Sequence, residues 1–189
     1  YVYVDKTALM YKLVKSGSYY FLSRPRRFGK SLLISTLEAY FEAKRDLFEG
    51  LAVETLEKDW VKRPVFHLDL NIGKYDTPDS LDKILNETLD YWESLYGTRS
   101  AETTLALRFA GVVGRAYEQS GERVAILIDE YDKPLLQAIG NEELQREFCN
   151  TLKPFYGVLK TMDGCIKFAL LTGVTKFGKV SVFSDLNNL

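Results

Sequence analysis

The chain has 189 residues, which fits one α/β domain and is long enough to bury a full hydrophobic core. Its formal net charge is −1, which excludes a domain drawn to nucleic acid or anionic lipid by overall charge. No apolar run reaches membrane-spanning length and no signal peptide opens the chain. The two cysteines have no C-x-x-C spacing, which excludes a disulfide framework or zinc site and favours free thiols in the cytoplasm.

The N-terminal part predicts a β-like run over residues 1–4, a helix over residues 6–15 and a buried strand over residues 19–22. Asp5 is the expected N-cap of the helix. The sequence opens without Met, so we expect a single domain over residues 1–189 that is an N-terminal piece of a longer protein.

The segment after this strand has the back half of a P-loop, or Walker A motif, in Gly29, Lys30 and Ser31. Gly29 lets backbone N–H groups approach phosphate oxygens closely. Lys30 places an ammonium group near the β- and γ-phosphates, and Ser31 offers a hydroxyl to Mg²⁺. A helix predicted over residues 30–41 would point its positive end at the same anion.

The motif departs from the full P-loop pattern at Arg24, which stands where the first glycine belongs. Arg24 either takes a strained backbone conformation or the loop follows another path. The basic cluster of Arg24, Arg26, Arg27 and Lys30 favours polyphosphate, with a nucleic-acid backbone as the rival ligand and a basic surface turn as the plainest alternative.

The rest of the chain alternates strands and helices, which predicts a parallel sheet. Ligands of such sheets bind at the carboxyl ends of the strands. Pro154 should stop or kink the last helix. Strands are expected over residues 65–70, 123–128 and 166–171, a short polar helix near residue 60, and helices over residues 79–95, 102–119 and 142–162.

The apolar strand over residues 123–128 ends in Asp129 and Glu130, which is the Walker B pattern. Asp129 would hold Mg²⁺ and Glu130 would orient or deprotonate the water that attacks the γ-phosphate. Taken alone, the pair is equally consistent with the start of a helix. Together with Gly29, Lys30 and Ser31 it favours a nucleotide site.

Thr172 ends the next strand, where it would contact the γ-phosphate or the attacking water; an exposed strand-end threonine is the alternative. Lys176 and Lys179 either reach phosphate or lie in a solvated loop. His67 is better explained as a packed, hydrogen-bonded histidine than as a catalytic one. Asp132 either supports Glu130 or is an acid in the first turn of a helix.

With these residues in view, the chain resembles the AAA-ATPase-like family of bacterial P-loop proteins, which are similar to archaeal-type and STAND ATPases. The resemblance covers nearly the whole chain. It is carried by residues 3–7 (Tyr-Val-Asp-Lys-Thr), 21–31 (Phe-Leu-Ser-Arg-Pro-Arg-Arg-Phe-Gly-Lys-Ser), 127–135 (Leu-Ile-Asp-Glu-Tyr-Asp-Lys-Pro-Leu), 171–177 (Leu-Thr-Gly-Val-Thr-Lys-Phe) and 183–189 (Phe-Ser-Asp-Leu-Asn-Asn-Leu).

The resemblance implies a three-layer α/β P-loop NTPase fold of the additional-strand type, with strand order 5-1-4-3-2 and the Thr172 strand between the P-loop and Walker B strands. It also implies that the protein continues, commonly into a region similar to PD-(D/E)xK nucleases. Related ATPases have Gly at the Arg24 position and match at Pro25, Arg26 and Arg27, so the departure bears on rate more than on binding.

The sequence therefore predicts a Mg²⁺-dependent, slow ATPase that acts as a nucleotide-dependent switch for a C-terminal region. The alternative is a module that binds nucleotide or nucleic acid without hydrolysis, and a small-molecule kinase ranks last because no acceptor site is visible. Oligomerisation and nucleic-acid contacts through the C-terminal region remain open. The expected site comprises catalytic Glu130, Lys30 and Thr172; nucleotide-binding Arg26, Arg27, Phe28, Gly29, Lys30, Ser31 and Leu32; and the Mg²⁺ ligands Ser31 and Asp129.

Overall fold

A computed structural model of the chain describes residues 4–25 and 27–175. Within these residues, four strands form one sheet in which every neighbouring pair is parallel. Their order across the sheet is β1-β4-β3-β2. The strands are β1 (Tyr19–Ser23), β2 (Val65–Asp69), β3 (Val124–Asp129) and β4 (Ile166–Gly173).

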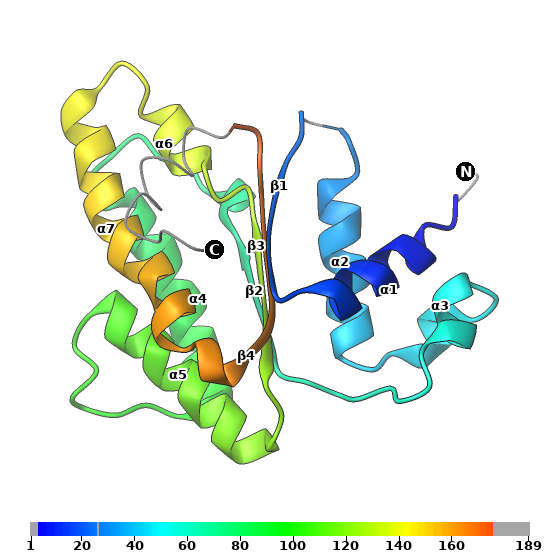
Figure 1. Cartoon of the computed structure of the whole chain (residues 1–189). Coiled ribbons are helices and arrows are strands. Elements are labelled where there is room, and N and C mark those ends of the chain that lie inside the picture. Colours follow the sequence, from blue (N-terminus) through cyan, green and yellow to red (C-terminus); the bar gives the residue numbers. More distant parts are fainter. Residues whose placement is uncertain (1–3, 26, 176–189) are drawn as a thin grey trace.

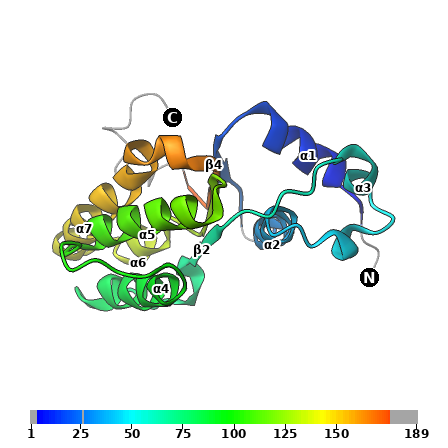
Figure 2. The same ribbon diagram turned by 90° about the horizontal axis from the view of Figure 1, so that it is seen from below.

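Helices cover both faces of the sheet, which gives three layers (Figures 1 and 2). One face carries α1 (Thr7–Ser16), α2 (Lys30–Phe41) and α3 (Ala52–Leu56). The other carries α4 (Ser80–Tyr96), α5 (Leu105–Ser120), α6 (Lys133–Gln137) and α7 (Glu142–Thr161). Short 3-10 turns occupy Arg45–Phe48, Leu70–Ile72 and Asp163–Cys165.

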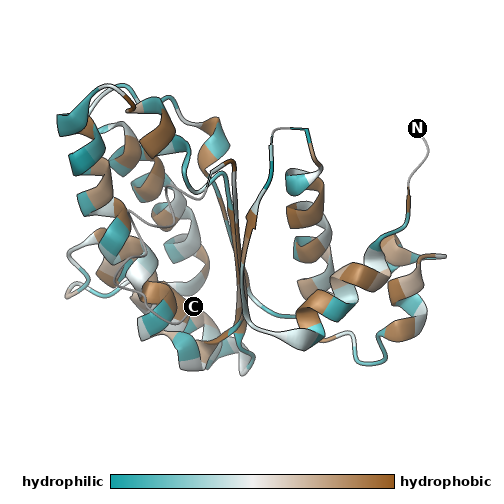
Figure 3. Cartoon of the chain, turned by 45° about the horizontal axis from the view of Figure 1, so that its top comes forward, coloured by the Kyte–Doolittle hydropathy of each residue, from teal (hydrophilic) through white to brown (hydrophobic). Residues whose placement is uncertain are grey.

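The inner strand β3 is apolar up to its last residue, Asp129, because each of its faces is buried in a different core. Val124, Ile126 and Ile128 pack into the core under α4, α5 and α7. Ala125 and Leu127 point the other way, into the core under α1 and α2. This is the burial that a parallel strand covered on both faces requires, and Figure 3 shows the apolar strands between helices whose hydrophilic sides face outward.

The four described strands agree with the corresponding part of the expected order. β4, which ends at Thr172 and Gly173, lies between the P-loop strand β1 and the strand β3 that ends at Asp129. The fifth strand of the expected order has no counterpart among residues 4–25 and 27–175, so the complete 5-1-4-3-2 arrangement stays a prediction.

The helices and strands predicted over the described residues occur, and the differences lie at their ends. The β-like run expected over residues 1–4 falls mostly on residues 1–3, which lie outside the described part of the chain, and Val4 is not in a strand. Helix α5 begins at Leu105, later than expected, because the Thr104 side chain caps it by accepting the N–H of Leu107 at 3.2 Å. Of the two effects expected of Pro154, a stop and a kink, the stop does not occur, since α7 continues through Pro154 to Thr161. Its buried residues on both sides of Pro154 pack into the core and outweigh the roughly 3 kcal/mol that an internal proline costs.

Candidate functional site

The carboxyl ends of the strands bring the predicted site segments together at one edge of the sheet, at the top of Figure 1. All strands run in the same direction, so β1, β3 and β4 each deliver a polar segment to that edge. Two backbone bonds join these segments: Arg24 N–H donates to the Gly173 carbonyl at 3.1 Å, and Tyr131 N–H donates to the Thr172 carbonyl at 2.9 Å.

Two of the described residues in the loop between β1 and α2 have a left-handed backbone conformation. Gly29 has φ 75° and immediately precedes α2, and Arg27 has φ 68°. A Cβ added at Gly29 would meet nothing within 4 Å, so its backbone conformation is what favours glycine there. Arg24 is not among the described residues with positive φ. The loop therefore follows the second of the two expected paths, and Arg24 continues the β1–β4 ladder without left-handed strain.

Lys30, the first residue of α2, is buried although it is charged. Its ammonium group donates to the Arg24 carbonyl at 2.9 Å and to the Pro25 carbonyl at 3.4 Å. It also forms an ion pair with Glu130 Oε1 at 3.1 Å. These contacts hold the ammonium group between the P-loop backbone and the end of β3.

Asp129 is the centre of a second group of contacts at the same edge. Ser31 Oγ donates to Asp129 Oδ2 at 2.6 Å, and the Thr172 hydroxyl donates to Asp129 Oδ1. The N–H of Glu130 reaches Thr172 Oγ1 at 3.4 Å. Asp129 and Thr172 are both buried. The alternative that Thr172 is an exposed strand-end residue is therefore wrong.

Glu130 has a left-handed backbone, with φ 55°. For a non-glycine residue this costs of order 1–3 kcal/mol and is concentrated at functional sites. The conformation turns the chain between β3 and α6 while the side chain lies against Lys30. Residues 129–132 are thus not the first turn of a helix; α6 begins at Lys133.

A polar cavity of about 390 Å³ opens at this edge, and seven of the described residues, from the P-loop, α2 and the segments after β2 and β3, line it. Sequence reasoning missed Asn71, which follows β2 at the same edge. Its N–H donates to Asp69 Oδ1 at 2.7 Å, and its carbonyl accepts from the Lys133 ammonium. A polar residue after a strand was the available signal. The lining residues are Arg27, Gly29, Lys30, Ser31, Leu32, Asn71 and Glu130.

An apolar cavity of about 550 Å³ lies on the other side of the P-loop, between α1 and α2. It shares Gly29 and Leu32 with the polar cavity. Phe28 and Leu32 are 68% and 57% exposed, although both are apolar. A bound molecule with a polyanionic part and a flat apolar part would thus find adjoining surfaces for both.

The family model described as Predicted AAA-ATPase matches residues 1–183. The chain belongs to the predicted AAA-ATPase family. A relative from Azotobacter chroococcum mcd 1, described as "Uncharacterized protein in vnfD 5'region", is 42% identical over 190 residues. The match covers 100% of this chain and 37% of that relative. No solved structure was found to match the chain.

Membership of the predicted AAA-ATPase family supports nucleotide binding in general terms. The geometry brings together Gly29, Lys30, Ser31, Asp129, Glu130 and Thr172, and it places Arg27 and Leu32 on the cavity wall. Phe28 lines the apolar cavity instead. The predicted contacts of Arg26, Lys176 and Lys179 lie outside the described residues. None of the described helices is long and apolar enough to cross a membrane.

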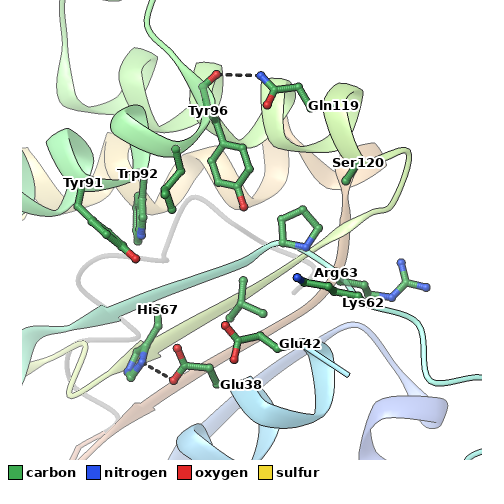
Figure 4. A pocket seen from close by; sticks show the side chains of 13 residues that line it. Glu38, Glu42, Lys62, Arg63, His67, Tyr91, Trp92, Tyr96, Gln119 and Ser120 are labelled. Atoms are coloured by element: carbon green, nitrogen blue, oxygen red, sulfur yellow. Dashed lines mark hydrogen bonds and ion pairs between the residues drawn. The ribbon is translucent and has the colours of Figure 1, made fainter. Parts of the chain in front are cut away.

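His67 lies away from this edge, in a different cavity of about 550 Å³ between α2 and α4 (Figure 4). Its Nδ1 is 3.0 Å from Glu38 Oε2, which confirms the interpretation of a packed, hydrogen-bonded histidine. Asp69 ends β2 at the same edge of the sheet as the polar cavity, and its side chain accepts the N–H of Asn71. Asp132 contacts Val174 and Thr175.

Proposed function

We propose that this chain binds ATP with Mg²⁺ and hydrolyses it slowly. The observation that carries the proposal is the meeting of Lys30, Ser31, Asp129, Glu130 and Thr172 at one edge of a parallel sheet, where three separate strands end. Lys30, Ser31 and Glu130 line a cavity beside the start of α2. Asp129 and Thr172 lie behind this wall and contact the Ser31 hydroxyl and the Glu130 N–H.

The polar cavity suits the phosphates. The left-handed turn at Gly29 and the free N–H groups of the first turn of α2 favour an anion there. Lys30 and Arg27 add positive charge to the same wall. A triphosphate would compete with Glu130 for the Lys30 ammonium group, so the ion pair between them would exchange on binding.

Mg²⁺ fits the pair of Ser31 and Asp129. Their side-chain oxygens lie 2.6 Å apart, and Mg²⁺ takes hard oxygen ligands in proteins, commonly one or two side chains with substrate phosphates and water. When bound, the ion neutralises charge that develops on the phosphates. Thr172 holds the other oxygen of Asp129, which fixes the orientation of the carboxylate.

Glu130 would accept the proton of the attacking water, or orient that water, at the γ-phosphate. Its carboxylate lines the cavity, and its backbone is fixed by the contact with Thr172. Lys30 would balance charge at the β- and γ-phosphates. The apolar cavity between α1 and α2 would take the base, with Phe28 and Leu32 as its exposed apolar surface.

A non-hydrolysing module is the second candidate, and Arg24 favours it. An arginine at the place of the first P-loop glycine leaves the early part of the loop as a continuation of the β1–β4 ladder. If the exposed arginines bound nucleic acid, the affinity would fall steeply with salt and Mg-ATP would compete.

We also propose that nucleotide state acts on other parts of a longer protein. The support is that the chain spans 37% of the length of its Azotobacter relative, so the relative has further regions on which such a domain would act. Oligomerisation and contacts with nucleic acid through such regions belong to the same proposal. The cytoplasm is the expected location.

The binding step is tested by thermal unfolding of this chain with and without Mg-ATP, beside Lys30→Ala. A site of about 10 μM affinity at about 1 mM ligand stabilises the fold by about 2.7 kcal/mol. For a chain of this size that raises the melting temperature by about 5–10 °C. We expect the shift in the wild type and its loss in Lys30→Ala. An equal shift in both proteins would contradict the site.

A further inference from the structure

Asp132 is buried with none of its surface exposed, three residues after the end of β3. Its carboxylate accepts three donors from the segment that follows β4. These are the N–H of Val174 at 3.1 Å, the N–H of Thr175 at 2.7 Å and the hydroxyl of Thr175 at 2.9 Å. A carboxylate only accepts hydrogen bonds, so it suits a position that faces three donors.

Glu130 and Tyr131, which lie between Asp129 and Asp132, are each hydrogen-bonded to the end of β4 or to the residues that follow it. The Glu130 N–H reaches Thr172 Oγ1 at 3.4 Å, and the Tyr131 N–H donates to the Thr172 carbonyl at 2.9 Å. The Tyr131 hydroxyl donates to the Thr175 carbonyl at 2.9 Å. The 129–132 segment is therefore bonded along its whole length to residues 172–175.

Residues 129–132 and 172–175 are packed closely against each other. A Cβ added at Gly173 would lie 2.6 Å from Asp132 Oδ1 and 2.6 Å from Tyr131 Cε1, closer than real side chains approach. Residues 173–174 are also joined to the start of the P-loop. Arg24 N–H donates to the Gly173 carbonyl at 3.1 Å, and Ser23 Oγ donates to the Val174 carbonyl at 3.1 Å.

We propose that Asp132 is a positioning residue of the proposed ATPase, on which this inference rests. By holding Val174 and Thr175, Asp132 fixes the end of β4, and so keeps the Thr172 hydroxyl on Asp129 and the backbone of Glu130 against Thr172. Asp132 does not line the polar cavity and acts through these residues. Hydrolysis therefore depends on Asp132 more than nucleotide binding does, because the side-chain hydrogen bonds and the ion pair of Lys30 and Ser31 within the described part of the chain involve neither Asp132 nor Thr175.

The test compares Asp132→Ala and Asp132→Asn with the wild type in single-turnover hydrolysis of Mg-ATP and in equilibrium binding of a fluorescent ATP analogue. Displacing a catalytic group by about 1 Å costs on the order of a hundredfold in rate. We expect Asp132→Ala to lose about ten- to a hundredfold in hydrolysis while its Kd changes much less. Asp132→Asn keeps one acceptor oxygen and should recover part of the rate.

Glu57→Gln is the matched control, since Glu57 is also a buried carboxylate that accepts several hydrogen bonds but lies far from the strand ends. It should be less stable than the wild type and hydrolyse ATP at the wild-type rate. A purely structural role for Asp132 would make Asp132→Ala behave like this control. A rate and an affinity for the analogue that fell by the same factor, or a rate equal to that of the wild type, would overturn the proposal.

Amide hydrogen exchange tests the role of Asp132 separately from hydrolysis. If the wild type bound Mg-ATP without hydrolysing it, the proposed ATPase activity would be contradicted, but the exchange experiment would still test whether Asp132 positions Glu130. We expect Asp132→Ala to exchange faster at residues 129–131 as well as at 172–175, and Glu57→Gln to match the wild type in both. Faster exchange confined to residues 174–175, with 129–131 unchanged, would show that Asp132 does not position Glu130 and would overturn the proposal.

Discussion

Two regions of the molecule bury carboxylates, and they differ in what surrounds the charge. Glu57, after α3, accepts hydrogen bonds from the Tyr40 hydroxyl and the Asp59 N–H and pairs with Lys15 at 2.9 Å. Asp129 and Glu130, at the end of β3, contact Ser31, Thr172 and Lys30. Both groups satisfy their charges, so burial and pairing do not distinguish them.

Backbone conformation and the adjoining cavity do distinguish them. Glu57 has φ −85°, an ordinary value, and its contacts join α1, α2 and the segment after α3. Glu130 has φ 55° and lines a cavity with Lys30 and Ser31. A buried charge whose hydrogen bonds and ion pairs are all made is therefore explained by structure alone. A strained backbone conformation beside a polar cavity indicates a functional site.

Removing the Thr172 hydroxyl should have the largest effect of three changes that test this comparison. Thr172→Val keeps the size of the side chain but leaves one oxygen of Asp129 without its donor. A hydrogen bond to a charged group contributes about 1.5–3 kcal/mol, so single-turnover hydrolysis should slow by about ten- to a hundredfold. Thr172→Ser keeps the hydroxyl and should stay near the wild-type rate. Equal rates for Val and Ser would remove Thr172 from the site.

Glu57→Gln should affect stability alone. Losing charged hydrogen bonds in a buried place should lower the free energy of unfolding in urea by roughly 1–3 kcal/mol. Distant sites act independently, so the Kd for Mg-ATP should stay within about twofold. A large change in Kd would show that the Glu57 region is energetically coupled to the strand-end site, and would contradict the distinction between them.

The pH dependence of stability sharpens the same test. Burial acts to raise the pKa of Glu57, but hydrogen bonds from Tyr40 and Lys15 outweigh it, and the net effect lowers the pKa. A carboxyl whose pKa is lower in the folded state stabilises the fold above its unfolded pKa of about 4.3. That stability is lost as the pH falls through the folded value. In urea unfolding, the difference in stability between the wild type and Glu57→Gln should therefore shrink steadily as the pH falls below about 4.3.

Phe28→Ala should have the smallest effect. Phe28 is exposed on the apolar cavity and does not line the polar one. Burial of part of an aromatic side chain against a base is worth about 1 kcal/mol, so the Kd for Mg-ATP should rise about fivefold. The affinity for inorganic triphosphate, which has no base, should not change. Equal losses for both ligands would place the base elsewhere.

Much of the fold could be predicted from the sequence because the strongest sequence patterns are those of buried apolar residues. The unbroken apolar run that became β3 predicts a strand covered on both faces, and it lies between two cores. The P-loop and the Asp129–Glu130 pair predict a shared edge, since parallel strands end together. The stop expected at Pro154 does not occur because local helix propensity takes no account of the buried contacts on both sides of the proline.

Those parts of the candidate site that depend on contacts between distant segments of the chain could not be predicted from the sequence. Asn71 lies in a polar turn, and only the fold brings it to the wall of the same cavity as Ser31. The contacts of Asp132 with Val174 and Thr175 span about forty residues, which no local pattern shows. The path of the loop at Arg24 was left open in the sequence, because it depends on the ladder between β1 and β4.

The most direct test of the proposed ATPase is single-turnover hydrolysis of Mg-ATP by the wild type and by Glu130→Gln. We expect the variant to be slower by about 10²–10⁴-fold, the usual contribution of a general base. Its affinity should be equal or higher, because glutamine carries no charge to compete for Lys30. Hydrolysis at the same rate in both proteins would contradict the account. Tight binding without measurable turnover in the wild type would establish the non-hydrolysing module in its place.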